Sequence, residues 1–136
     1  MLTIGSLPKA EKAKGFETLV CIGHESAKAQ AFKNSADVLK GPKVMAFTFP
    51  FGKLWKKKAR KVYEAGSIVA DVKGKVYLTA YGGVNLLAWV AYVVYRVQGA
   101  GKEKAIAMVK ETHATVGALA NWDVRELEKC VKGGAK

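Results

Sequence analysis

The chain has 136 residues, of which half are apolar, and its formal net charge at pH 7 is +12. This length and composition predict one domain with a hydrophobic core and exclude a disordered tail. A polyanion relieves the self-repulsion of so much positive charge in a small domain, so nucleic acid is the first partner to consider.

The N-terminal part of the chain is predicted to form a basic arm. Residues 1–15 are rich in lysine, and residues 16–23 form an apolar patch that fits either a strand or the buried face of a helix. Residues 25–40 predict a helix, because alanine is the strongest helix former and a Gly-Pro pair follows the segment. Residues 43–52 contain Pro50 and predict an extended linker or an edge strand.

Two interpretations stay open for residues 67–82, which follow a predicted helix over residues 53–66. As strands, residues 68–72 and 76–81 flank a Lys-Gly-Lys turn and predict a β-hairpin. As a helix, the apolar residues recur at steps of three and four. Taken alone, the segment favours the hairpin, although apolar residues on both faces make the alternation imperfect.

The rest of the chain predicts helices. Residues 83–98 are apolar nearly all round and predict a central buried helix. A second helix is expected over residues 102–120, and a last one is capped by Asp123 and ends near Lys132. The predicted fold is therefore mainly α, with a basic N-terminal helical arm followed by a helical bundle. The alternative is an α+β fold with a hairpin at 68–81.

The charge is distributed unevenly within the single domain expected over residues 1–136. Residues 1–66 hold 13 cations and 5 acids, whereas residues 67–136 hold 10 cations and 6 acids. We therefore interpret residues 1–66 as a nucleic-acid-binding arm and residues 67–136 as an apolar helical half that assembles copies of the chain.

A run of positive charge without any acid extends from Lys40 to Lys61. Clustered lysines bind phosphate groups with strong, salt-dependent and sequence-independent affinity. Phe49 and Trp55 lie in the same run and could stack on the bases of a single strand. The residues predicted to bind nucleic acid are Lys9, Lys12, Lys14, Lys40, Lys43, Lys53, Lys56, Lys57, Lys58, Arg60 and Lys61.

Little in the sequence predicts catalysis. His24 and His113 are the only histidines, and no metal-binding spacing, nucleotide-binding glycine loop or nucleophile motif is present. We therefore expect no enzyme activity, no metal and no cofactor. Cys21 and Cys130 are too few for a disulfide scaffold, and a bridge between them stays open. The absence of a signal peptide and of a long apolar run predicts a virion or intracellular location without a transmembrane segment.

This layout resembles that of the DNA-packaging coat proteins of filamentous archaeal viruses. The counterparts would be a basic arm over Lys9–Lys61 and an Ala-, Val- and Tyr-rich bundle over Val84–Leu119. The resemblance implies an all-helical protein whose copies wrap double-stranded DNA and assemble into a filament. The sparse amides and plentiful lysine lean toward a hyperthermophilic host.

These observations predict a structural protein that packages double-stranded DNA non-specifically and self-assembles as a viral nucleocapsid. A single-stranded-DNA-binding or chromatin protein of archaeal type is the first alternative, since it shares the charge and the composition. A module that binds an anionic membrane surface or an acidic partner is the second. Strandedness, oligomer symmetry and viral or cellular origin stay open.

Overall fold

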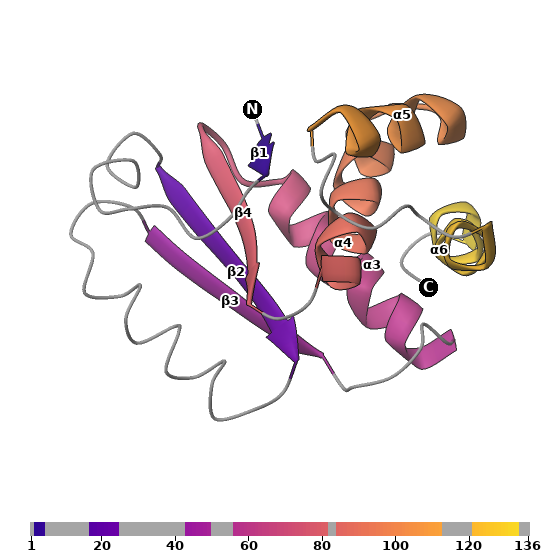
Figure 1. Cartoon of the computed structure of the whole chain (residues 1–136), viewed down its shortest axis with the longest axis horizontal. Coiled ribbons are helices and arrows are strands. Elements are labelled where there is room, and N and C mark those ends of the chain that lie inside the picture. The colour runs from indigo at the N-terminus through magenta and orange to yellow at the C-terminus, as the bar shows by residue number, and fades with distance from the viewer. Residues whose placement is uncertain are drawn as a thin grey trace. The chain divides into compact units, whose positions relative to one another are not determined.

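The structure is a computed structural model that describes residues 2–4, 17–24, 43–49, 56–81, 84–112 and 121–133. The chain divides into two compact units. The first covers Met1–Phe51 and Val72–Gly83, and the second covers Gly52–Asp71 and Val84–Lys136. Each unit combines segments that are separated in the sequence (Figure 1).

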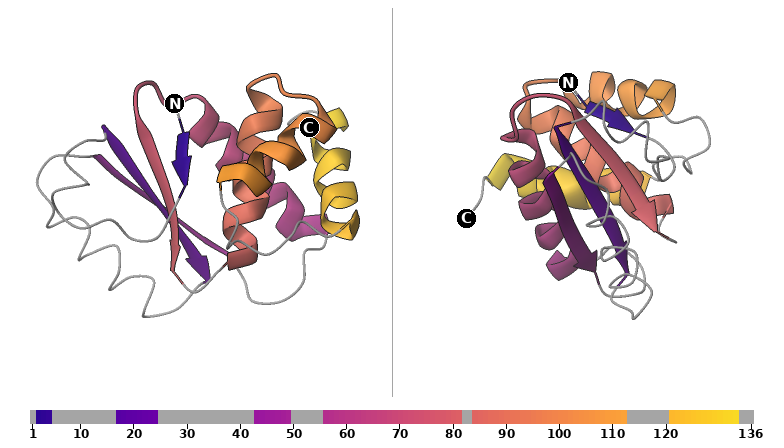
Figure 2. Two further views of the ribbon diagram at one scale, coloured as in Figure 1. Left: turned by 45° about the horizontal axis from the view of Figure 1, so that its top comes forward. Right: turned by 90° about the vertical axis from the view of Figure 1, so that its left-hand side faces the viewer.

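The first unit contains a parallel four-stranded sheet. Its strands are β1 (Leu2–Ile4), β2 (Thr18–His24), β3 (Lys43–Phe49) and β4 (Val76–Tyr81). They lie in the order β1-β4-β2-β3, and every neighbouring pair is parallel (Figure 2). The strand β3 lies at an edge of the described sheet, which confirms the edge-strand interpretation for residues 43–49 of the segment 43–52.

The two central strands bury side chains at consecutive positions. Leu19 and Val20 of β2 are buried, as are Leu78 and Thr79 of β4. Successive side chains of a strand point to opposite faces, so both faces of these strands are covered. Near-continuous apolar runs are typical of parallel strands in this situation, and they explain the imperfect alternation of residues 76–81.

The hairpin predicted at 68–81 is wrong. The helix α3 (Lys56–Ala70) covers the first part of this segment, and β4 forms the last part. Gly74 lies between them with a φ of +89°, a left-handed conformation that favours glycine. The backbone N–H groups of Glu17 and Thr18 donate to the Lys75 carbonyl at 3.0 and 3.2 Å, which aligns the starts of β2 and β4.

The second unit is helical. It contains α3, α4 (Val84–Val97), α5 (Lys102–Thr112) and α6 (Asn121–Gly133), and α4 contacts each of the other three helices. Every residue of α4 from Leu87 to Tyr95 is buried, which confirms the central buried helix predicted over residues 83–98. The last predicted helix is confirmed by α6, but α6 begins at Asn121, so Asp123 lies inside the helix and is not its cap.

Helices α3 and α4 are in close contact at a glycine. Ala59, Val62 and Val69 form the buried face of α3 at helical spacing. Gly66 lies on this face, where an added Cβ would be 2.7 Å from Cβ of Val93. The absence of a side chain at Gly66 therefore sets the distance between the two helices.

The helix α4 ends in a cap that contains a glycine. Gly99 has a φ of +109°, the Ala100 N–H donates to the Tyr95 carbonyl at 3.0 Å, and the Gly99 N–H donates to the Arg96 carbonyl at 3.1 Å. This pair of bonds is the Schellman motif, which ends a helix at a left-handed glycine.

The mainly α prediction is correct only in part. More of the described residues lie in helices than in strands, but the parallel sheet gives the chain an α/β character. Residues Leu2–Ile4 of the expected helical arm form β1, and the helix predicted over residues 25–40 lies outside the described residues. The boundary placed between residues 66 and 67 falls inside α3.

Candidate anion-binding site

A cleft of about 400 Å³ lies between α5 and α6. Its walls carry four cations, one acid and two apolar side chains. The lining residues are Lys102, Ile106, Val124, Arg125, Glu128, Lys129 and Lys132.

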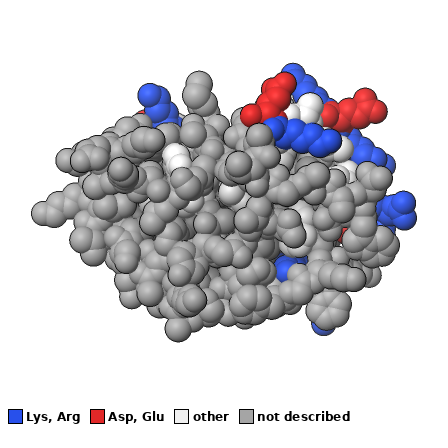
Figure 3. Space-filling view, in the orientation of Figure 1, with Lys and Arg blue, Asp and Glu red and all other residues white. Residues whose placement is uncertain are grey.

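Helical spacing brings most of these cations together. Arg125, Lys129 and Lys132 follow one another at steps of four and three, so they share one side of α6. Lys102 joins them as the first residue of α5. Figure 3 shows Lys and Arg side chains beside acidic side chains in the region of α5.

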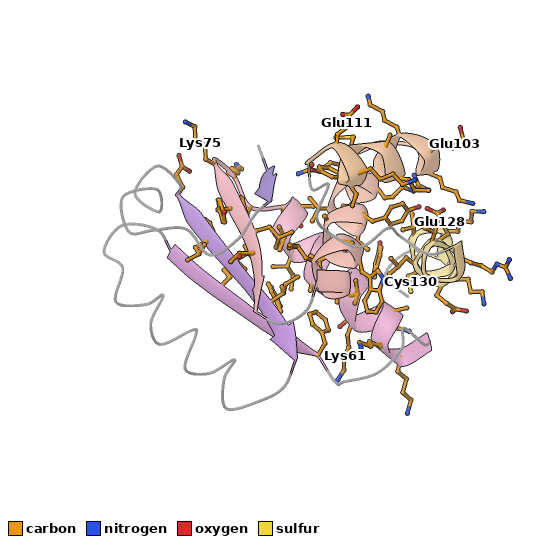
Figure 4. All side chains as sticks on the ribbon, viewed as in Figure 1. Lys61, Lys75, Glu103, Glu111, Glu128 and Cys130 are labelled. Carbon is orange, nitrogen blue, oxygen red and sulfur yellow. The ribbon has the colours of Figure 1, made fainter. Side chains whose placement is uncertain are left out.

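The acid in the cleft, Glu128, is held by two residues of α4. Its Oε1 accepts from Arg96 Nε at 2.6 Å and from the Tyr92 hydroxyl, and its Oε2 accepts from Arg96 Nη2 at 3.0 Å. Arg96 Nη1 also donates to the Ala100 carbonyl at 2.9 Å. The side chain of Glu128 is only 7% exposed and that of Arg96 is 19% exposed, so water screens this ion pair weakly. Figure 4 labels Glu128 on α6.

The network fixes the protonation of its members. Hydrogen bonds from Arg96 lower the pKa of Glu128 despite its burial, which acts in the opposite direction. Burial, followed by the hydrogen bond to Glu128, raises the pKa of Tyr92. At neutral pH, Glu128 is therefore a carboxylate and Tyr92 is a protonated donor.

Acid should weaken this network. The pKa of Glu128 is lower in the folded chain than in the unfolded chain, so its stabilising contribution is complete above the unfolded value and is lost as the pH falls through the folded value. We expect the melting temperature of the wild type to fall over this acidic window. The matched Glu128→Gln variant should lose part of that pH dependence, and parallel curves for the two proteins would contradict the assignment.

Few of the residues predicted to bind nucleic acid lie on a described surface. Lys57, Arg60 and Lys61 are exposed on α3. Lys43 lies on β3 and Lys56 begins α3, and for these two residues the structure describes the backbone only. The predicted residues outside the described ranges are Lys9, Lys12, Lys14, Lys40, Lys53 and Trp55.

Two of the predicted contact residues are buried. Lys58 is 1% exposed, and its ammonium lies 5.3 Å from the centre of the Trp89 ring, a cation–π distance. Burial lowers the pKa of Lys58. Phe49 is 2% exposed. These positions correct the expectation that Lys58 meets phosphates and Phe49 stacks on bases at the surface, because neither side chain reaches it.

Other groups in the described part of the chain offer less chemistry. Cys130 is a free thiol on α6, and burial, the largest influence, raises its pKa. Thr79 Oγ1 is buried and finds no hydrogen-bond partner among the described residues. Within those residues, no group of three or more His, Cys, Asp or Glu side chains could hold a metal ion. No described helix is both long and apolar enough to cross a bilayer.

A parallel sheet in which β3 and β4 are connected through the helix α3 is typical of an α/β protein. No protein-family model and no curated protein matches the sequence. Among solved structures, the fold is similar to that of Tk-PTP, a protein tyrosine phosphatase, in its active form. The TM-score is 0.66 at 16% sequence identity, over 97% of this chain and 91% of that chain. Identity this low shows the fold alone.

This similarity overturns the predicted function. The expected DNA-packaging nucleocapsid protein was an arm with a helical bundle, whereas nearly the whole chain follows the fold of a phosphatase. The expectation that the chain is not an enzyme is overturned by the same match. Net charge reports on attraction to anions in general and carries no information about fold.

Sequence reasoning missed the cationic cleft. The spacing of Arg125, Lys129 and Lys132 was visible in the sequence. Nothing in it showed that Lys102 would lie across from them, or that Arg96 would neutralise Glu128 between them.

Proposed function

We propose that this chain acts on phosphate monoesters, the substrates of phosphatases. The observation that carries the proposal is the similarity of its fold to Tk-PTP over nearly the full length of both chains. The net charge of +12 supports it, because a positive field raises the local concentration of a doubly charged phosphate group.

The beginning of α4 supports phosphate binding further. The unpaired N–H groups at the start of a helix, together with the helix dipole, bind phosphate. The first turn of α4 contains no acid, and the sequence from Val76 to Tyr95 contains no charged residue. A phosphate bound at this helix end would therefore be held by main-chain donors, and cationic side chains would have to come from other segments.

The two cysteines differ as nucleophiles. The thiolate is the reactive form of cysteine, and an activated thiol has a lowered pKa. Because burial raises the pKa of Cys130, this thiol is a poor nucleophile at neutral pH. Any thiol-based hydrolysis would then depend on Cys21, the other cysteine of the chain.

The direct test is hydrolysis of p-nitrophenyl phosphate by the whole chain. We expect turnover in the wild type and in Cys130→Ser, with rates within about twofold of each other, since Cys130 is not an activated thiol. Loss of turnover in Cys130→Ser alone would contradict this assignment. In Cys21→Ser, loss of activity at preserved melting temperature would identify a thiol mechanism, and full activity would indicate a hydroxyl or water nucleophile. If the wild type neither hydrolyses p-nitrophenyl phosphate nor binds phosphate, the proposed function is refuted.

A further inference from the structure

The cleft between α5 and α6 holds positive charge that its own acids do not balance. Of its four cations, Lys129 pairs with Glu126 at 3.1 Å. Lys102, Arg125 and Lys132 form no ion pair with any described residue. Three cations from two helices therefore line one cleft without forming an ion pair, although Lys132 acts on Glu128 at longer range and helps to lower the pKa of that carboxyl.

Glu128 does not cancel this charge. Both of its oxygens accept hydrogen bonds from Arg96, and Oε1 also accepts one from Tyr92. The carboxylate is thus paired with a fifth cation that does not line the cleft. An incoming anion would meet a neutral ion pair at Glu128 and not an isolated negative charge.

The start of α5 adds to the positive field. Lys102 is the first residue of this helix, and the Ala105 N–H makes the first helical bond to the Gly101 carbonyl at 2.8 Å. The three N–H groups before Ala105 therefore lie at the positive end of the helix dipole. The acids of α5, Glu103 and Glu111, project away from α6 (Figure 4).

The size and walls of the cleft indicate a small organic ligand. A volume of about 400 Å³ falls within the usual range of ligand pockets, roughly 300–1,000 Å³. Ile106 is half-buried and supplies most of the apolar wall between the cations, because Val124, which also lines the cleft, is almost fully buried. A free inorganic ion would use the cations and leave Ile106 uncovered.

We propose that the α5–α6 cleft is a binding site for an organic phosphate, with its phosphate group on Lys102, Arg125 and Lys132 and its apolar body against Ile106 and Val124. A phosphate group carries about two negative charges and three acceptor oxygens, which match three cations, whereas a carboxylate carries only one charge. Arg125 can bind two of the oxygens at once. This site is inferred from the side chains of the cleft and does not rest on the proposed function.

The test measures binding of phenylphosphonate, whose carbon–phosphorus bond a phosphatase does not hydrolyse. Titration calorimetry would compare the wild type with Arg125→Gln/Lys132→Gln on α6 and with Lys102→Gln on α5. Lys110→Gln is the matched control for Lys102→Gln, because it removes the same single charge from an exposed position of α5 outside the cleft. We expect the double variant to bind at least about tenfold more weakly, Lys102→Gln several-fold more weakly, and Lys110→Gln within about twofold of the wild type.

Three results would overturn the proposal. The first is that the wild type does not bind phenylphosphonate. The second is that Lys110→Gln loses as much affinity for phenylphosphonate as the cleft variants do. The third is that the wild type binds benzoate, which has the same ring and one charge, as tightly as phenylphosphonate. Melting curves check that the variants are folded, and Lys102→Gln provides an independent test from the other helix. Hydrolysis of p-nitrophenyl phosphate by Arg125→Gln/Lys132→Gln separates this proposal from the proposed function, because either property can be lost while the other is retained.

Discussion

Replacing Glu128 by methionine should lower the free energy of unfolding by about 3 kcal/mol, the low end of the range for breaking a buried ion pair. The change leaves Arg96, whose side chain is 19% exposed, without its carboxylate, and it removes the acceptor of the Tyr92 hydroxyl. The loss should appear as a shift of the urea midpoint with an unchanged slope.

The control for this prediction is the double variant Arg96→Met/Glu128→Met. Removing both charges avoids an unpaired buried cation, so the double variant should be more stable than Glu128→Met alone. Tyr92→Phe isolates the hydroxyl and should cost only about 1 kcal/mol. If Glu128→Met and the double variant are equally destabilised, the cost comes from packing and not from the charge left on Arg96.

Gly66→Ala should destabilise the chain by roughly 1–3 kcal/mol, although alanine is the better helix former. The new methyl group would overlap Val93, whose Cβ lies 2.7 Å from the ideal Cβ position, and would approach the Val90 carbonyl oxygen at 3.4 Å. Helices α3 and α4 would have to move apart to accept it. Thermal or urea unfolding measures the effect.

The neighbouring residue provides a matched control. Ser67 already has a Cβ, and its hydroxyl donates to the Tyr63 carbonyl of the same helix at 2.8 Å. Ser67→Ala should therefore change stability by less than about 0.5 kcal/mol. Val93→Ala should partly rescue Gly66→Ala, so that the double variant is less destabilised than the sum of the two changes. Additive losses would show that Gly66 is not limited by Val93.

Local sequence patterns predicted the elements whose environment is simple. The helix α4 was recognised because residues 83–98 are apolar nearly all round, which only a central helix tolerates. The edge strand β3 was indicated by a short apolar segment that ends at Pro50. The helix α6 buries Val124 and Leu127, three residues apart, within a mostly polar sequence, the usual pattern of an amphipathic helix.

The sheet could not be predicted because its pairings are distant. β1 has three residues, and its partner in the sheet is β4, with Leu2 opposite Val76. β2 buries adjacent residues, so it lacks the alternation that distinguishes a strand from a buried helix. The Lys-Gly-Lys turn at Gly74 suits a hairpin in isolation, and only the preceding helix shows that it leads into a parallel strand.

The candidate site could not be predicted from the sequence for a related reason. A lysine- or arginine-bearing helix face is usually solvated, and α6 alone gives no sign of a cleft. The site requires α5 to contribute Lys102 and α4 to contribute Arg96, and neither relation is encoded in local spacing. The acid-free run from Lys40 to Lys61 indicates a binding surface from sequence alone, although Lys58 within it is buried.

The strand order has a consequence for how the chain folds. β4 is the last strand in the sequence, yet it lies between β1 and β2, and β1 has no other partner among the described strands. The sheet is incomplete until residues 76–81 are available to pair. Until then, β1 and one edge of β2 have no strand to pair with. Such long-range closure makes folding slow and leaves unpaired strand edges exposed while it proceeds.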